Sequence, residues 1–135
     1  MAEAGYSGTP LSKKLGYKPG FRVKIVNQPE NYWQLLIDLP EDVHEEMEGP
    51  YDLIHFFTSQ RSELEKELPR LKEEIDKKGM LWISWPKKSS GVESDIDGNI
   101  VRATGLESGL VDAKVCAVDG TWSGLKFVYR LKDRK

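Results

Sequence analysis

The stretch YDLIHFF, residues 51–57, decides the fold class that this chain is expected to adopt. Apolar side chains occur at odd and even positions alike, so both sides of a strand formed here would be buried. A strand that is apolar on both sides is typical of the centre of a parallel sheet covered by helices. Gly49 and Pro50 mark a clear break in the chain just before it.

Further strands are indicated on both sides of this stretch. The runs Arg22–Val26 and Met80–Trp85 are largely apolar and predict two more buried strands, the second of which is stopped by Pro86. Residues 42–48 are mostly acidic and predict at most a weak edge strand. We expect the three strong strands to occupy adjacent positions in one sheet, because successive parallel strands commonly lie side by side.

Helical patterns separate these strands. Leucine and isoleucine recur at spacings of four, three and four, which is the stripe of an amphipathic helix. The positions are Leu64, Leu68, Leu71 and Ile75. We expect this helix to begin near Gln60 and to end at Gly79. Because proline disrupts a helix interior, we also expect a kink or break near Leu68, with Pro69 in the first turn of a second segment. A later helix is expected to be capped by Ser94 or Asp95.

The chain closes with two further strands, Val111–Val118 and Leu125–Leu131, joined by residues 119–124. The Gly and Asp residues of this connection favour an antiparallel hairpin at one edge of the sheet. The alternation of strands and helices before it predicts an α/β three-layer sandwich with a mainly parallel, Rossmann-like sheet.

The composition is typical of one globular domain over residues 1–135, of which we expect residues 1–8 to be flexible. The net charge of −2 provides no global attraction to nucleic acid or membranes. The single Cys116 and the two histidines exclude a disulfide framework and a zinc-ligand pattern. We expect a cytoplasmic protein without a membrane segment; the sequence indicates no particular cofactor and no oligomeric state.

The order of elements resembles the class I, Rossmann-like methyltransferase fold. Leu15–Gly20 followed by an apolar strand is similar to that family's approach to its cofactor loop, and Gly49–Ile54 resembles its fourth strand. The resemblance implies a glycine-rich loop for S-adenosylmethionine after the first strand and an acidic residue after the second. Here residues 27–31 contain no glycine, and Pro29 lacks an N–H donor. We therefore predict that S-adenosylmethionine does not bind with useful affinity.

Three segments also resemble the recurrent blocks of a family of small bacterial proteins known only as a domain of unknown function. They are SGTPLSKKLG, LWISWPKKSSG and GLVDAKVCAVDGTWSGLKFVYR. The resemblance implies the same fold and no particular activity.

A ligand site is expected beyond the carboxyl ends of the parallel strands, where ligands bind in open α/β sheets. This rule brings together the loops at residues 27–31, 58–61, 86–91 and 119–124. They supply cations, hydroxyls, an amide and flat aromatic faces, which suit an anionic ligand with a planar group. The candidate binding residues are Asn27, Ser59, Arg61, Trp85, Lys87, Lys88, Ser89, Ser90, Trp122 and Ser123.

A structural interpretation competes with this one. Lys87 and Lys88 could be ordinary solvated charges, and the two tryptophans could close the core. His55 lies in the middle of a strand, and we interpret it as a hydrogen-bonded core histidine. Cys116, also within a strand, is expected to be buried and inert. No Ser-His-Asp or paired-carboxylate set can be assembled, so whether the protein is an enzyme stays open.

The sequence leaves three possible functions open. The first is a small binding or regulatory domain for an anionic small molecule, with a phosphate-like or nucleotide-like group. The second is an S-adenosylmethionine-dependent transferase with a modified cofactor loop. The third is a single-stranded RNA-binding module that uses the lysines and tryptophans of the same edge. Nucleic acid is the weaker expectation, because acidic residues are spread along the chain and interrupt any basic stripe.

Overall fold

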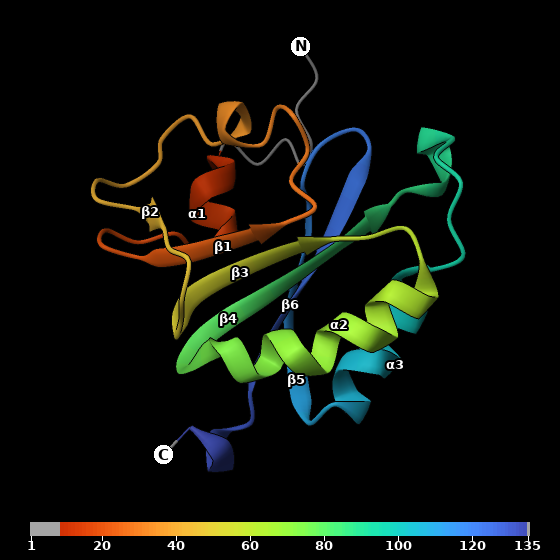
Figure 1. Ribbon diagram of the computed structural model, residues 1–135. Helices are drawn as coiled ribbons and strands as arrows, with labels where there is room; N and C mark the ends of the chain where they lie inside the picture. The colour runs from red at the N-terminus through yellow and green to blue at the C-terminus, as the bar shows by residue number, and fades with distance from the viewer. Residues whose placement is uncertain (1–8, 135) are drawn as a thin grey trace.

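A computed structural model describes residues 9–134, so the expectation for residues 1–8 lies outside the described part of the chain. One sheet runs through the molecule, with helices on both sides of it (Figure 1). The helical elements are α1 (Leu11–Leu15), η1 (Trp33–Leu35), α2 (Arg61–Glu74), η2 (Lys88–Ser90), α3 (Gly98–Glu107) and η3 (Leu131–Asp133). The strands are β1 (Arg22–Val26), β2 (His44–Glu45), β3 (Tyr51–Phe57), β4 (Ile75–Pro86), β5 (Leu110–Ala117) and β6 (Trp122–Tyr129).

The strand order is β2-β1-β3-β4-β6-β5. The first four strands in this order are parallel, whereas β6 pairs antiparallel with both β4 and β5. The expected mainly parallel sheet with a C-terminal antiparallel hairpin at its edge is confirmed, and so is the adjacency of the three strong strands. The acidic stretch after Pro40 contributes only the two-residue edge strand β2.

One side of the sheet, called the helical face here, is covered by α2 and α3, which lie together in Figure 1. The stripe predicted for α2 is buried in this layer, since Leu64, Leu68 and Leu71 are at most 2% exposed. They pack against sheet residues whose side chains point to this side. These include Ile54, Phe56, Leu81, Ile83, Leu125 and Phe127.

The other side, called the N-terminal face here, is covered by α1, η1 and the irregular chain around them (Figure 1). Leu15 and Tyr32 are fully buried there against Trp82 of β4. The indole Nε1 of Trp82 donates to the Leu15 carbonyl over 2.7 Å, so the end of α1 is bonded directly to a sheet side chain. Cys116 belongs to the same buried cluster, as expected, and burial raises the pKa of its thiol.

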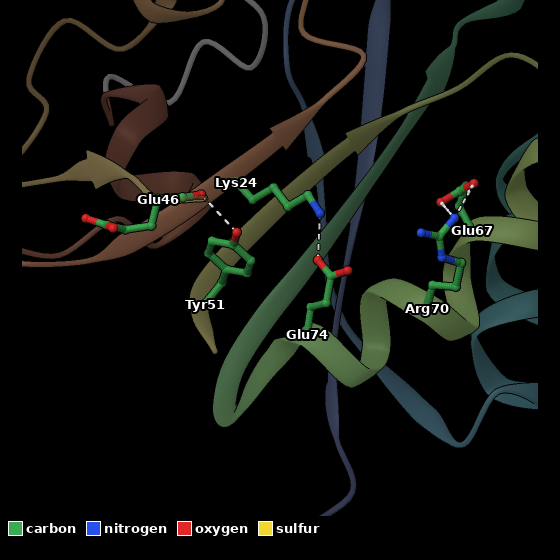
Figure 2. Close-up of polar contacts among 6 residues, drawn as sticks. All are labelled: Lys24, Glu46, Tyr51, Glu67, Arg70 and Glu74. Atoms are coloured by element: carbon green, nitrogen blue, oxygen red, sulfur yellow. Dashed lines mark hydrogen bonds and ion pairs between the residues drawn. The ribbon is translucent and has the colours of Figure 1, made fainter. Parts of the chain in front are cut away.

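Polar contacts connect β1 and β3 with the segments next to β2 and β4 (Figure 2). Lys24 of β1 forms an ion pair with Glu74 at the end of α2, with Nζ and Oε1 2.6 Å apart. The Tyr51 hydroxyl donates to the Glu46 carbonyl over 2.9 Å. Asp52 accepts a hydrogen bond from the Arg22 amide at the start of β1, so its carboxylate faces away from the carboxyl ends, as expected.

The boundary between α2 and β4 differs from the prediction. The helix ends at Glu74, and Ile75–Gly79 already belong to β4. Ile75 is 4% exposed as the first residue of β4, and its spacing from Leu71 also fits the helical stripe, so the sequence pattern did not distinguish helix from strand. Gly79 does not end the helix; a Cβ there would lie 2.8 Å from the Tyr51 carbonyl, so glycine permits the close approach of β4 to β3. The expectation of a break near Leu68 and a second segment from Pro69 is also wrong, since α2 is one helix with Pro69 inside it.

Two smaller differences concern the C-terminal part. The cap of α3 is Asp97, whose carboxylate accepts from the Ile100 amide over 3.0 Å, and neither Ser94 nor Asp95 serves there. Trp122 already begins β6, so the hairpin connection is shorter than expected. The Asp119 carboxylate accepts from the amides of Thr121 and Trp122, which accounts for the tight turn. Within residues 9–134, no helix has the length and apolar character needed to cross a bilayer.

Candidate functional site

The four loops expected at the carboxyl ends of the strands do meet. Hydrogen bonds link the end of β1 to β3, the end of β3 to β4 and to the segment before α3, and the end of β4 to the hairpin. After β1, the Asn27 side-chain amide donates to the Phe57 carbonyl over 2.8 Å. After β3, the Thr58 amide donates to the Ser84 carbonyl over 3.0 Å, and the Ser59 carbonyl accepts from the Asp95 amide over 3.3 Å. After β4, the Lys87 amide donates to the Thr121 carbonyl over 2.8 Å.

The ends of β1 and β3 are closed by their own side chains. Asn27 has a φ of 59°, a left-handed conformation that asparagine tolerates better than most residues. Its amide nitrogen donates to the Phe57 carbonyl and to the Glu63 carboxylate, the latter over 3.0 Å. The hydroxyl of Thr58 donates to the other oxygen of Glu63 over 2.5 Å. The polar groups that follow these two strands therefore bind one another.

The first turn of α2 is likewise occupied by side chains of the protein. The Arg61 amide donates to the Asp95 carboxylate over 2.6 Å, and the Gln60 amide to the Thr58 hydroxyl over 3.2 Å. The Arg61 guanidinium, expected to meet a ligand, forms an exposed ion pair with Glu65, with Nε and Oε2 3.1 Å apart. Two of the donors that this helix end would offer an anion are thus already used.

The loop after β4 differs from the loops after β1 and β3 in the pairing of its charged side chains. Its backbone is held firmly, because the Lys87 amide binds the hairpin and both the amide and the hydroxyl of Ser90 donate to the Lys87 carbonyl, over 3.0 and 2.6 Å. Gly91 completes the turn with a φ of 78°. Lys88 and Ser89 are exposed and Lys87 is half-buried. Within residues 9–134, neither lysine ammonium group has a hydrogen bond or ion pair.

The two tryptophans of the candidate site lie on opposite faces of the sheet. Trp122 packs edge-on against Phe57 in the N-terminal cluster, with ring centroids 5.0 Å apart. Trp85 packs against the helical cluster, and its ring covers Gly98 at the start of α3. Ser123 is paired with Trp85 in the β4–β6 register. The structure therefore does not bring the two indoles together as one platform for a planar group.

A buried polar chain lies beneath the N-terminal face. The hydroxyls of Tyr17 and Tyr32 are 2.6 Å apart, Tyr32 is bonded to Nδ1 of His55 over 2.9 Å, and Nε2 of His55 to the Ser84 hydroxyl over 2.8 Å. All four side chains are at most 4% exposed. Burial lowers the pKa of His55 to about 3 and raises the pKa values of both tyrosines. The prediction of a hydrogen-bonded core histidine is confirmed.

Sequence reasoning missed the tyrosines of this chain. Tyr17 and Tyr32 follow no helical or strand period, so the only available signal was a histidine in an apolar strand, which needs buried partners. Because His55 is neutral near pH 7 and out of contact with solvent, it is not placed to exchange protons with a bound substrate.

The methyltransferase resemblance implies an acidic residue after the second strand, and the position of the short strand β2 bears on that expectation. It pairs with Arg22 and Val23, in the first half of β1. The acidic residues in and after it, Glu45 and Glu46, therefore lie beside the first half of β1, short of its carboxyl end at Asn27. The amide of Glu46 donates to the Val23 carbonyl over 3.2 Å, which fixes this position.

No protein-family model matches the sequence, and neither does any curated protein. The resemblance to the bacterial family of unknown function therefore stays a prediction.

Solved structures do match the fold. The ribosomal protein L11 methylase of Lactobacillus delbrueckii subsp. bulgaricus has a TM-score of 0.59 at 13% identity, covering 88% of this chain and 74% of that one. Aeropyrum pernix fibrillarin with natively bound S-adenosyl-L-methionine gives 0.60 at 11% identity, covering 93% and 71%. The magnesium protoporphyrin IX methyltransferase of Synechocystis PCC 6803 gives 0.58 at 10%, covering 89% and 76%. The chain has a methyltransferase-like fold, which is all that identities this low establish.

Proposed function

We propose that the protein is a binding domain that recognises an anionic, phosphate-bearing group at the loop after β4, and that it does not transfer methyl groups. One observation carries the proposal. At the carboxyl edge the polar groups after β1 and β3 are bonded to one another, whereas the ammonium groups of Lys87 and Lys88 have no partner within residues 9–134.

The physical case rests on a rigid loop that carries free charge. The backbone of residues 87–91 is already ordered by its hydrogen bonds, so binding would require little further ordering. Charge-assisted hydrogen bonds from ammonium groups to phosphate oxygens are stronger than neutral ones. Both lysines are at least partly in contact with solvent, so the binding is expected to weaken as salt rises.

The test is amide NMR of the full chain titrated with inorganic phosphate, nucleotides and a short single-stranded RNA. We expect saturable shifts of residues 86–91 and 119–121 at millimolar ligand. The double variant Lys87→Gln, Lys88→Gln should lose them while keeping its other signals in place. Lys66→Gln removes one charge from an exposed lysine of α2 that has no hydrogen bond or ion pair within residues 9–134, and it should bind as the wild type does.

Two outcomes would reject this proposal. One is the absence of any shift in residues 86–91 at millimolar concentrations of every ligand tried. The other is an unchanged titration of the double variant. A marked preference for the RNA over phosphate and nucleotides would replace the small-ligand proposal by the RNA-binding alternative.

A second candidate is an S-adenosylmethionine-dependent transferase with a modified cofactor loop. The fold likeness favours it, because fibrillarin and the protoporphyrin methyltransferase carry that cofactor in their structures. Asn27 also has the left-handed backbone that glycine adopts easily. Against it stand the bonds of Asn27 to Phe57 and Glu63, which a cofactor at this loop would have to displace. Direct addition of S-adenosylmethionine separates the two candidates, because only the transferase should be stabilised by it.

A further inference from the structure

A second group of cations lies away from the strand ends, in the hairpin formed by β5 and β6. Lys114 of β5 and Lys126 of β6 are direct partners in the antiparallel register. Side chains so opposed have Cβ atoms about 5 Å apart, and like charges in that position are destabilising. Since Leu125 and Phe127 point into the helical cluster, Lys126 points to the N-terminal face.

Helix α1 brings further lysines to the same place. The ammonium group of Lys114 donates to the carbonyl of Lys14 in the last turn of α1 over 3.2 Å, and Lys18 follows that helix. Lys126 is half-buried and pairs in register with Trp82, the residue bonded to Leu15. Burial, together with the charges of Lys114 and Lys18, lowers the pKa of Lys126.

No acidic side chain balances this group in the described part of the chain. Within residues 9–134, Lys18, Lys114 and Lys126 form no ion pair, although the whole sequence has more acidic than basic residues. The acidic residue of β5, Asp112, is bonded to Arg102 of α3 over 3.0 Å. A lysine on an edge strand discourages pairing with another chain. This explains the presence of a lysine at position 114 on β5, but not that of the half-buried Lys126 on β6.

We propose that Lys18, Lys114 and Lys126 form a second anion site, the hairpin site, which binds a phosphate group. The uncompensated charge is the reason: a multiply charged oxyanion would satisfy several ammonium groups at once, and it would relieve the repulsion across β5 and β6. The site is distinct from the Lys87–Gly91 loop, so either can fail without the other.

The hairpin site is tested by amide NMR of the full chain, titrated with inorganic phosphate and then with ADP at constant ionic strength set by chloride. We expect saturable shifts at residues 114–116 and 124–127. Lys126→Gln should weaken the binding seen at these residues about tenfold. Lys66→Gln, and the double variant at Lys87 and Lys88, should leave it unchanged.

Thermal unfolding gives an independent readout. In chloride alone, Lys126→Gln should melt at or above the wild-type temperature, because it removes a half-buried charge beside two others. Phosphate should raise the melting temperature of the wild type more than that of the variant. Equal affinity for phosphate and ADP, or tighter binding of ADP, both support a phosphate site; only the second extends it to a nucleotide.

The proposal is overturned if residues 114–116 and 124–127 do not respond to millimolar phosphate beyond an equal ionic strength of chloride. It is also overturned if Lys126→Gln lowers the melting temperature while phosphate binding stays the same, since Lys126 would then be a packing residue only.

Discussion

The two faces of the sheet are covered in different ways. The helical face is covered by α2 and α3, two regular helices that bury aliphatic and aromatic side chains (Figure 1). The N-terminal face is covered by one five-residue helix, one 3-10 turn and irregular chain. Beneath that cover runs the polar chain from Tyr17 through Tyr32 and His55 to Ser84.

A cover without regular helices needs directional contacts to hold it in one position. Apolar contact is not directional, whereas a hydrogen bond between buried groups fixes distance and angle and is expensive to break. The polar chain and the bond from Trp82 to Leu15 anchor the irregular cover at named points. This cover includes the segment after β1, where the methyltransferase resemblance implies a cofactor. We infer that these hydrogen bonds hold the irregular cover in one position over the N-terminal face.

The largest expected effect comes from the packing of the helical face. In Gly105→Ala the new methyl group would lie 2.1 Å from the Phe127 ring, which is too close for any packed structure. Alanine normally favours a helix over glycine by about 1 kcal/mol, but overpacking of this kind should reverse the sign. We expect a loss of about 3 kcal/mol in the free energy of unfolding, measured by urea denaturation.

Gly120→Ala is the matched control. Apart from its own chain neighbours, no heavy atom of residues 9–134 lies within 4 Å of the position of its Cβ, so the same chemical change should cost little. Similar losses in both variants would show that the close contact of α3 with β6 does not determine the packing of the helical face.

The N-terminal face should respond to pH. His55 has a pKa of about 3 in the folded protein and about 6.5 when unfolded, so below pH 6.5 the unfolded state binds a proton that the folded state does not. Stability contributed in this way is lost as pH falls. Between pH 7 and 5 the free energy of unfolding should decrease by about 2 kcal/mol on account of this histidine.

Urea denaturation at several pH values checks this expectation. His55→Gln, which cannot titrate, should flatten the decrease between pH 7 and 5. An equally steep decrease in His55→Gln and in the wild type would contradict the description of the buried polar chain.

The sequence predicted the sheet and the helical face because both depend on periodic or continuous apolar patterns, as in residues 51–57 and in the leucines of α2. The polar chain could not be predicted, since Tyr17 and Tyr32 contact His55 only through tertiary structure. The strand-end rule correctly joined the four loops, but it does not say which charges are already paired. The spacing of Arg61 and Glu65 by four residues on a helix was a signal of such a pair.

The most direct test of whether the carboxyl ends of β1 and β3 are closed to this cofactor is the melting temperature with and without S-adenosylmethionine. Because Asn27, Thr58 and Glu63 bind one another after β1 and β3, we predict no change up to millimolar cofactor. A ligand specific for the folded state would stabilise it by about 2.7 kcal/mol at 100 times its Kd. A saturable rise in melting temperature at micromolar S-adenosylmethionine would contradict the account and favour the transferase.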